Sequence, residues 1–210
     1  MSAEAFLLAA ARGDDATVRN MLSNRTVEPN MVVSKCCPNG ETFGDVSALM
    51  FAASGGHASV VTLLLADDRV DPNIADHKGV TALMGAAMKA HASVVTLLLA
   101  DDRVNPNMAD DQKGFTALML AARRGHPPVV TLLLANDRVD PNMASQVGNT
   151  ALIFAAIKGH APVVTLLLAD GRVDPDLTNQ YGRTAITCAS LNRHDSVVKL
   201  LLADDAVWIN

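Results

Sequence analysis

The feature that most constrains this 210-residue chain is an apolar string that returns five times at a nearly fixed spacing. One clear copy is Thr81 to Ala87, read as Thr-Ala-Leu-Met-Gly-Ala-Ala, followed by Val-Val-Thr-Leu-Leu-Leu at 94–99. The copies begin at Ser47, Thr81, Thr116, Thr150 and Thr184, which gives steps of 34, 35, 34 and 34 residues. A fixed period in this range is typical of repeat proteins, in which each unit buries its apolar face against its neighbours. We therefore predict one continuous domain over residues 1–210.

The repeated string resembles the ankyrin repeat, a β-turn and two helices whose first helix begins with a Thr-Pro-Leu-His signature. Here the signature reads Thr-Ala-Leu-Met, with Met50, Met84, Met119, Ile153 and Thr187 at the histidine position. The Gly-His pair between the helices is kept in three copies, and Val-Val-x-Leu-Leu-Leu in all five. The resemblance implies an all-α solenoid, an ankyrin-repeat stack of about six helix-turn-helix units with β-hairpin-like loops.

The repeat register also divides the chain into parts. We predict an N-terminal capping unit at 1–30, an elongated loop at 31–46, four full repeats at 47–183 and a C-terminal capping repeat at 184–210. The loop is predicted because Pro29 and Ser47 lie 18 residues apart, where later copies have nine or ten. Within it, Pro38-Asn39-Gly40 indicates a turn, since Asn and Gly tolerate positive φ. The insertion is either a functional loop or tolerated extra length, because loop entropy grows slowly.

Particular residues predict where the helices begin and end. Ser or Thr at the start of each copy predicts an N-cap, because its hydroxyl accepts a hydrogen bond from a free N–H of the first turn. Gly56, Gly125 and Gly159 stand just past the first helix, where a left-handed backbone is often needed. Ala90 and Arg193 take this position in two copies. A left-handed non-glycine residue costs about 1–2 kcal/mol.

Composition restricts the class of protein and its compartment. No apolar run approaches the roughly 18 residues of a membrane span, and Met1-Ser2-Ala3-Glu4 lacks the basic start of a signal peptide. Cys36, Cys37 and Cys188 cannot form a disulfide framework, which favours a reducing compartment. We expect a cytoplasmic monomer without membrane attachment, with the nucleus as the alternative compartment.

Residues that could carry chemistry are few. Five of the six histidines recur at one repeat position, which favours a structural role in the loop. The exception, His77, could join Cys36 and Cys37 as a zinc site, but adjacent cysteines lack the usual ligand spacing. A Cys-His nucleophile pair is a further alternative, although no third group orients it. We therefore expect a non-enzymatic protein without a cofactor or metal.

In the ankyrin family, partners bind mainly along the hairpin tips and the exposed face of the first helix. The candidate partner-binding residues are those that differ between copies at these positions: His77, Lys78, Val80, Met88, Lys89, Gln112, Lys113, Phe115, Arg123, Arg124, Gln146, Asn149, Ile157, Lys158, Tyr181 and Arg183. This set holds seven Lys or Arg and no acid, so the chain's net charge of −5 leaves −12 on the remaining residues. We predict a basic concave face and an acidic outer side. The alternative is an ordinary solvated surface.

These patterns predict a protein–protein interaction module, such as an adaptor, inhibitor or effector, for an acidic partner with apolar anchors. Its basic residues would steer the partner, and apolar contacts would come from Val80, Met88, Phe115, Ile157 and Tyr181. The alternative function is nucleic-acid binding through the same basic residues. The acidic net charge and an aromatic content of only 3% argue against that alternative.

Overall fold

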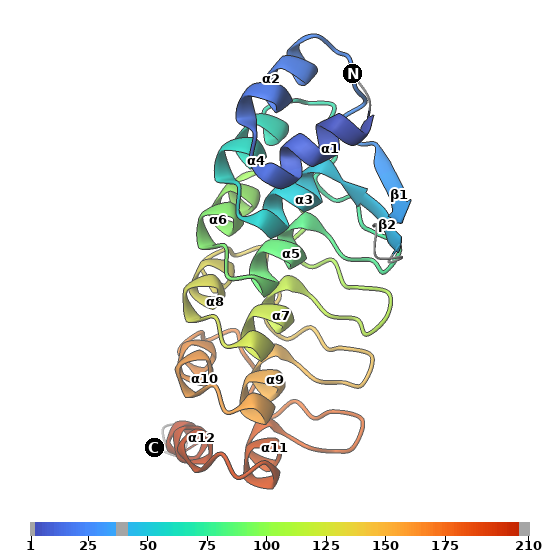
Figure 1. Cartoon of the computed structure of the whole chain (residues 1–210). Coiled ribbons are helices and arrows are strands. Elements are labelled where there is room, and N and C mark those ends of the chain that lie inside the picture. Colours follow the sequence, from blue (N-terminus) through green and yellow to red (C-terminus); the bar gives the residue numbers. More distant parts are fainter. Residues whose placement is uncertain (1–2, 37–41, 206–210) are drawn as a thin grey trace. The chain divides into compact units, whose positions relative to one another are not determined.

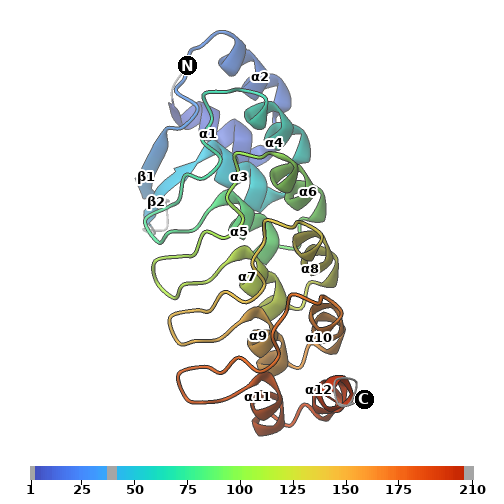
Figure 2. The same cartoon turned by 180° about the vertical axis from the view of Figure 1, so that it is seen from behind.

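A computed structural model describes residues 3–36 and 42–205 of the chain. The chain divides into two compact bodies of equal length, the N-terminal half (Met1–Asn105) and the C-terminal half (Pro106–Asn210). Each half consists of short antiparallel helix pairs joined by loops (Figure 1). Seen from behind, the loops of each half project from the first helices, opposite the second helices (Figure 2).

The N-terminal half contains three helix pairs. They are α1 (Ala3–Arg12) with α2 (Asp15–Ser23), α3 (Ala48–Gly55) with α4 (Ala58–Leu65), and α5 (Ala82–Met88) with α6 (Ala92–Ala100). The first helices pack on one another in chain order, and so do the second helices. Ala52 and Ala53 are fully buried between first helices, and Val60 and Leu64 between second helices. Small side chains in α3 let neighbouring helices approach closely, which accounts for the alanine-rich pattern.

The inserted segment forms an antiparallel hairpin of β1 (Val32–Cys36) and β2 (Thr42–Ser47). Val32 lies opposite Ser47, and a bulge interrupts the pairing between Val33 and Lys35. Strand β2 runs directly into α3, because Ser47 is also the N-cap of that helix. The turn predicted at Pro38-Asn39-Gly40 lies outside the described residues.

The C-terminal half repeats the same arrangement. Its pairs are α7 (Ala117–Arg124) with α8 (Pro127–Leu134), α9 (Ala151–Lys158) with α10 (Ala161–Leu168), and α11 (Ala185–Leu191) with α12 (Asp195–Asp205). Met119 and Ile153 are buried in the first helices, and Leu133 and Leu167 in the second helices. The twelve helices of the described residues confirm the predicted all-α repeat fold.

The predictions made for the helix ends are confirmed. The hydroxyl of each predicted N-cap accepts a hydrogen bond from the N–H three residues later, at 3.3 Å in Ser47, Thr81, Thr116 and Thr150 and 3.5 Å in Thr184. The left-handed position has φ values of 74°, 71° and 72° in Gly56, Gly125 and Gly159. Ala90 and Arg193 adopt the same conformation, with φ values of 63° and 60°. These two residues therefore carry backbone strain that glycine would relieve.

We expect Ala90→Gly and Arg193→Gly to leave the free energy of unfolding unchanged or to raise it by up to about 1 kcal/mol. Removing a left-handed penalty of about 1–2 kcal/mol is partly offset by the greater unfolded-state entropy of glycine. Urea unfolding followed by circular dichroism measures the change. The control is Ala169→Gly at the exposed C-cap of α10, where φ is −71°. The free energy of unfolding of this control should fall by up to about 1 kcal/mol.

Candidate functional site

The recurring histidines connect neighbouring repeats. Their Nε2 atoms lie 3.0–3.2 Å from a backbone carbonyl oxygen of the preceding repeat: His57 from Ala11, His91 from Ser54, His160 from Arg123 and His194 from Ile157. A carbonyl oxygen can only accept, so Nε2 carries the proton. Each ring also covers the preceding left-handed position, because a Cβ atom on Gly159 would lie 2.6 Å from His194 Nδ1. This geometry supports the structural role predicted for the period-locked histidines.

The Asp-x-Arg turns after the second helices also bind one repeat to the next. Arg172 pairs with Asp170 at 2.7 Å and donates from Nη1 and Nη2 to the carbonyl oxygens of Val139 and Leu134. The bond to Leu134 satisfies an acceptor at the end of the preceding second helix, and the bond to Val139 satisfies one in the loop that follows that helix. Equivalent ion pairs join Asp67 to Arg69 at 2.5 Å and Asp101 to Arg103 at 2.6 Å.

An asparagine in four of the loops makes a matching connection in the other direction. Asn142 donates from Nδ2 to the carbonyl oxygen of Arg172 at 2.6 Å, and its Oδ1 accepts from the N–H of Asp174 at 2.8 Å. The same pair of bonds is made by Asn30, Asn73 and Asn107. The loop residues that repeat in register therefore stabilise the contact between neighbouring repeats.

The guanidinium of Arg172 lowers the pKa of Asp170, because it donates two hydrogen bonds to the carboxylate. A depressed folded-state pKa stabilises the fold above the unfolded-state pKa, and this contribution is lost as the pH falls through the folded-state value. Asp170→Asn should therefore lower the free energy of unfolding at pH 7 by less than about 1 kcal/mol, since the pair is partly exposed. Urea unfolding should show the difference shrinking below about pH 4. A difference that stays constant down to the lowest pH would contradict this assignment.

In the C-terminal half, candidate partner-binding residues gather around an aromatic pair. Phe115 packs edge-to-face against Phe154 of α9, with ring centroids 5.0 Å apart and planes at 82°. Arg123 Cζ and Lys113 Nζ lie 5.5 Å and 5.8 Å from the centroid of the Phe115 ring. Within the described residues, neither cation forms an ion pair with a carboxylate. Their positive charges are therefore held by an aromatic ring without being neutralised.

The hairpin tips of this half form a second part of the same surface. The N–H of Gln146 donates to the carbonyl oxygen of Lys113 at 2.9 Å, and the N–H of Gln180 donates to that of Val147 at 3.1 Å. These bonds place successive tips side by side. Tyr181 is 66% exposed, and Arg183 Cζ lies 5.7 Å from its ring centroid. The tips thus present an apolar ring and unneutralised cations close together.

Two residues predicted as exposed partner contacts are buried, so their expected exposure was wrong. Phe115 is only 8% exposed, because its ring packs on Phe154. Asn149 is 9% exposed, because it bonds to Ser145 through its backbone and accepts from Asn179 at its Oδ1. Repeat register locates a hairpin tip, but it does not give the face on which each side chain lies.

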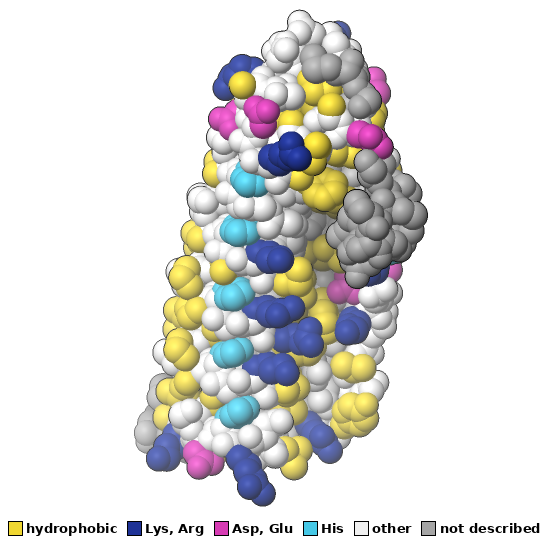
Figure 3. Space-filling view, viewed as in Figure 1, with side chains coloured by type: hydrophobic (Ala, Val, Ile, Leu, Met, Phe, Trp, Pro, Cys, Tyr) yellow, Lys and Arg dark blue, Asp and Glu magenta, His cyan; other side chains and the backbone are white. Residues whose placement is uncertain are grey.

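The other predicted residues lie at the surface to different degrees. Those exposed are His77, Lys78, Lys89, Gln112, Lys113, Arg124, Gln146, Lys158, Tyr181 and Arg183, and those half-buried are Val80, Met88, Arg123 and Ile157. In the C-terminal half, Lys and Arg side chains gather over α7 and α9 beside the histidines (Figure 3). Sequence reasoning missed Phe154, although its register position carries Leu120 and Cys188 in neighbouring copies. The ring itself was the available signal, although Phe51 carries a ring at the same position of the first full copy.

Metal and thiol chemistry have little support among the described residues. No three His, Cys, Asp or Glu side chains come together there as metal ligands. Cys37 and the side chain of Cys36 lie outside the described part of the structure, so the zinc alternative stays a hypothesis. Cys188 is buried in α11, and this burial raises the pKa of its thiol. No described helix is long and apolar enough to cross a membrane.

Helix pairs with projecting loops and shared inter-repeat bonds define a helical repeat protein. The sequence model of a protein family described as ankyrin repeats (3 copies) matches residues 6–110, 49–145 and 118–209. The chain therefore belongs to the ankyrin-repeat family, whose members are generally protein–protein interaction modules and typically non-enzymatic. A search of curated proteins found no significant match.

Proposed function

We propose that this chain is a non-enzymatic module that binds an acidic protein partner with apolar anchors. The binding surface consists of the hairpin tips and first helices of the C-terminal half. One observation carries the proposal: Lys113, Arg123 and Arg183 lie on aromatic rings, whereas Arg172 is neutralised by a carboxylate. A cation held on a ring keeps its charge for a partner. We also propose that the protein acts in the cytoplasm, and that residues 1–30 and 184–210 cap the two ends of the repeat array.

The exposure of each side chain predicts how it contributes to partner binding. Exposed ion pairs contribute about 0–1 kcal/mol each, so Arg124 and Lys158 should act together and mainly on the association rate. Exposed tyrosines are typical anchors of protein interfaces, and Tyr181 should contribute more affinity per residue. The partner should therefore carry acidic groups on both sides of an apolar contact.

The experiment reverses the charges of Arg123, Arg124 and Lys158 to glutamate. The partner is first captured from the native host, identified and purified, and its affinity is then measured by surface plasmon resonance. We expect the triple variant to bind at least about thirtyfold more weakly, because three favourable charge contacts become repulsive. Circular dichroism should show an unchanged helix content. Unchanged affinity in the folded triple variant would disprove the proposed surface.

A second triple variant provides the control. Reversing Arg103, Arg138 and Arg172 changes the net charge equally but affects loop residues of the repeat register. It should lower the free energy of unfolding more than it changes partner affinity. Steeply salt-dependent binding of duplex DNA or RNA, abolished by the first triple variant, would favour the nucleic-acid alternative instead.

A further inference from the structure

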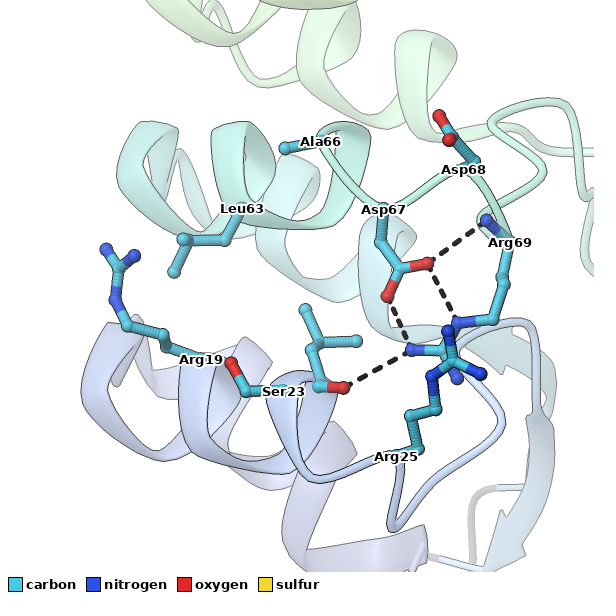
Figure 4. Close-up of a pocket in the computed structure, with 9 residues that line it drawn as sticks. Arg19, Ser23, Arg25, Leu63, Ala66, Asp67, Asp68 and Arg69 are labelled. Atoms are coloured by element: carbon cyan, nitrogen blue, oxygen red, sulfur yellow. Dashed lines mark hydrogen bonds and ion pairs between the residues drawn. The ribbon is translucent and has the colours of Figure 1, made fainter.

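A cleft on the second helices of the N-terminal half is separate from the surface proposed above. It has a volume of about 440 Å³ and lies between the C-terminal ends of α2 and α4 (Figure 4). Leu22 and Leu63 form apolar parts of its lining, and Arg19, Arg25 and Arg69 contribute guanidinium groups. The cleft therefore combines an apolar wall with positive charge.

Two of these arginines replace residues that the regular repeats carry at the same positions. Arg19 stands where the next four repeats have Thr62, Thr96, Thr131 and Thr165. Arg25 stands where those repeats have Asp68, Asp102, Asp137 and Gly171. The regular repeats fold without an arginine at either position. The helix pair of a regular repeat therefore does not need an arginine at these two positions.

The guanidinium groups of Arg25 and Arg69 lie at one end of the cleft, and Arg19 lies at the other (Figure 4). Arg69 donates to Asp67 through Nε at 2.9 Å and Nη2 at 2.5 Å, and its Nη2 lies 3.4 Å from the carbonyl oxygen of Leu22. Unlike Arg103 and Arg172, it makes no Nη1 bond to the preceding loop among the described residues.

Arg25 adds a second cation at this end. Its φ of 50° is left-handed, and its guanidinium makes no hydrogen bond or ion pair within the described part of the chain. Its positive charge helps to lower the pKa of Asp67, after the larger effect of the hydrogen bonds from Arg69. Asp67 is hydrogen-bonded by Arg69, and Glu28 also acts on Arg69 through its charge, whereas the donors of Arg25 are left for another anion.

We propose that this cleft binds an acidic peptide segment of a partner protein, with a carboxylate at Arg25 and Arg69 and an apolar side chain on Leu22 and Leu63. Guanidinium groups match the planar, two-oxygen geometry of a carboxylate. Asp68 lines the far rim, with its carboxylate directed away from Arg25 (Figure 4). That negative charge disfavours a polyanion such as nucleic acid and favours a ligand with one acid beside an apolar group.

The test titrates the ¹⁵N-labelled full chain with the capped peptide acetyl-Leu-Ala-Glu-Ala-Leu-amide and follows backbone amide shifts by NMR. We expect the shifts to centre on residues 19–25 and 63–69. The same peptide with glutamine in place of glutamate should bind at least about tenfold more weakly. Arg25→Gly should weaken binding by a similar factor. Glycine suits a φ of 50° and occupies the same register position at Gly171, so this variant should fold normally.

The matched control is Lys199→Gln, which removes a cation from the register position of Arg19 in the last repeat. This control should leave the peptide affinity unchanged. Equal affinity in Arg25→Gly, or the same shifts with inorganic phosphate alone, would overturn the proposal. Shifts confined to the C-terminal half would also overturn it, while leaving the surface around Phe115 and Tyr181 intact.

Discussion

Replacing Phe115 with alanine is expected to lower the free energy of unfolding by about 3 kcal/mol, at the lower end of values for buried aromatic residues. The ring is 8% exposed and packs at 5.0 Å on Phe154, so its removal leaves a cavity beneath the hairpin. The same change removes the ring on which Arg123 and Lys113 lie. Urea unfolding measures the loss of stability, and binding of the identified partner reports on the displaced cations.

Tyr181→Ala is the matched control for the second aromatic ring. Tyr181 is 66% exposed, so its replacement should change the free energy of unfolding by less than about 0.5 kcal/mol. It should nevertheless weaken partner binding, because the ring is available as an anchor. A loss below about 1 kcal/mol for Phe115→Ala would show that this ring does not support the hairpin.

Gly159→Ala is expected to lower the free energy of unfolding by about 3 kcal/mol, through backbone strain and the displacement of a histidine. Gly159 has a φ of 72°, and an added Cβ would lie 2.6 Å from His194 Nδ1. Moving the ring would also disturb the 3.1 Å contact between His194 Nε2 and the carbonyl oxygen of Ile157. Urea unfolding measures the combined effect.

Gly182→Ala separates these two causes. Gly182 has a φ of 67°, but a Cβ there would meet no atom within 4 Å. Its replacement should therefore cost only the left-handed penalty of about 1–2 kcal/mol. In a His194→Ala background, the two glycine variants should become nearly equal. If Gly159→Ala keeps its full additional cost in that background, the histidine is not responsible for it.

The fold could be predicted from the sequence because its determinants recur locally. The N-cap role of Thr150 and the left-handed backbone of Arg193 depend on residues within one repeat, and each has counterparts in other copies. The inserted segment was predicted by its length alone. Its pairing of Val32 with Ser47 depends on a cross-strand register that has no second copy in the chain.

The candidate site was harder to predict from the sequence, because it depends on contacts between repeats. The burial of Phe115 requires a ring at Phe154, which lies in the following repeat. Sequence reasoning treated residues 1–30 only as a capping unit, so it overlooked the charge of Arg25. It also could not show that Arg69 lacks the Nη1 bond made by Arg103. A difference in bonding of this kind emerges only when equivalent residues are compared in three dimensions.

The asparagine bonds between loops have a consequence for how such a chain can change in length. Asn107 and Asn142 each bind the next loop through the same two backbone groups. Duplication of a whole repeat would therefore create a new junction with matching donors and acceptors. A one-residue insertion between the arginine and the asparagine of a loop would instead move the asparagine out of register and break both bonds. The extra residue between Asn107 and Thr116 follows the asparagine and leaves both of its bonds in place. Gene rearrangements that copy complete repeats can thus extend the binding surface without requiring new hydrogen-bonding residues at the junction.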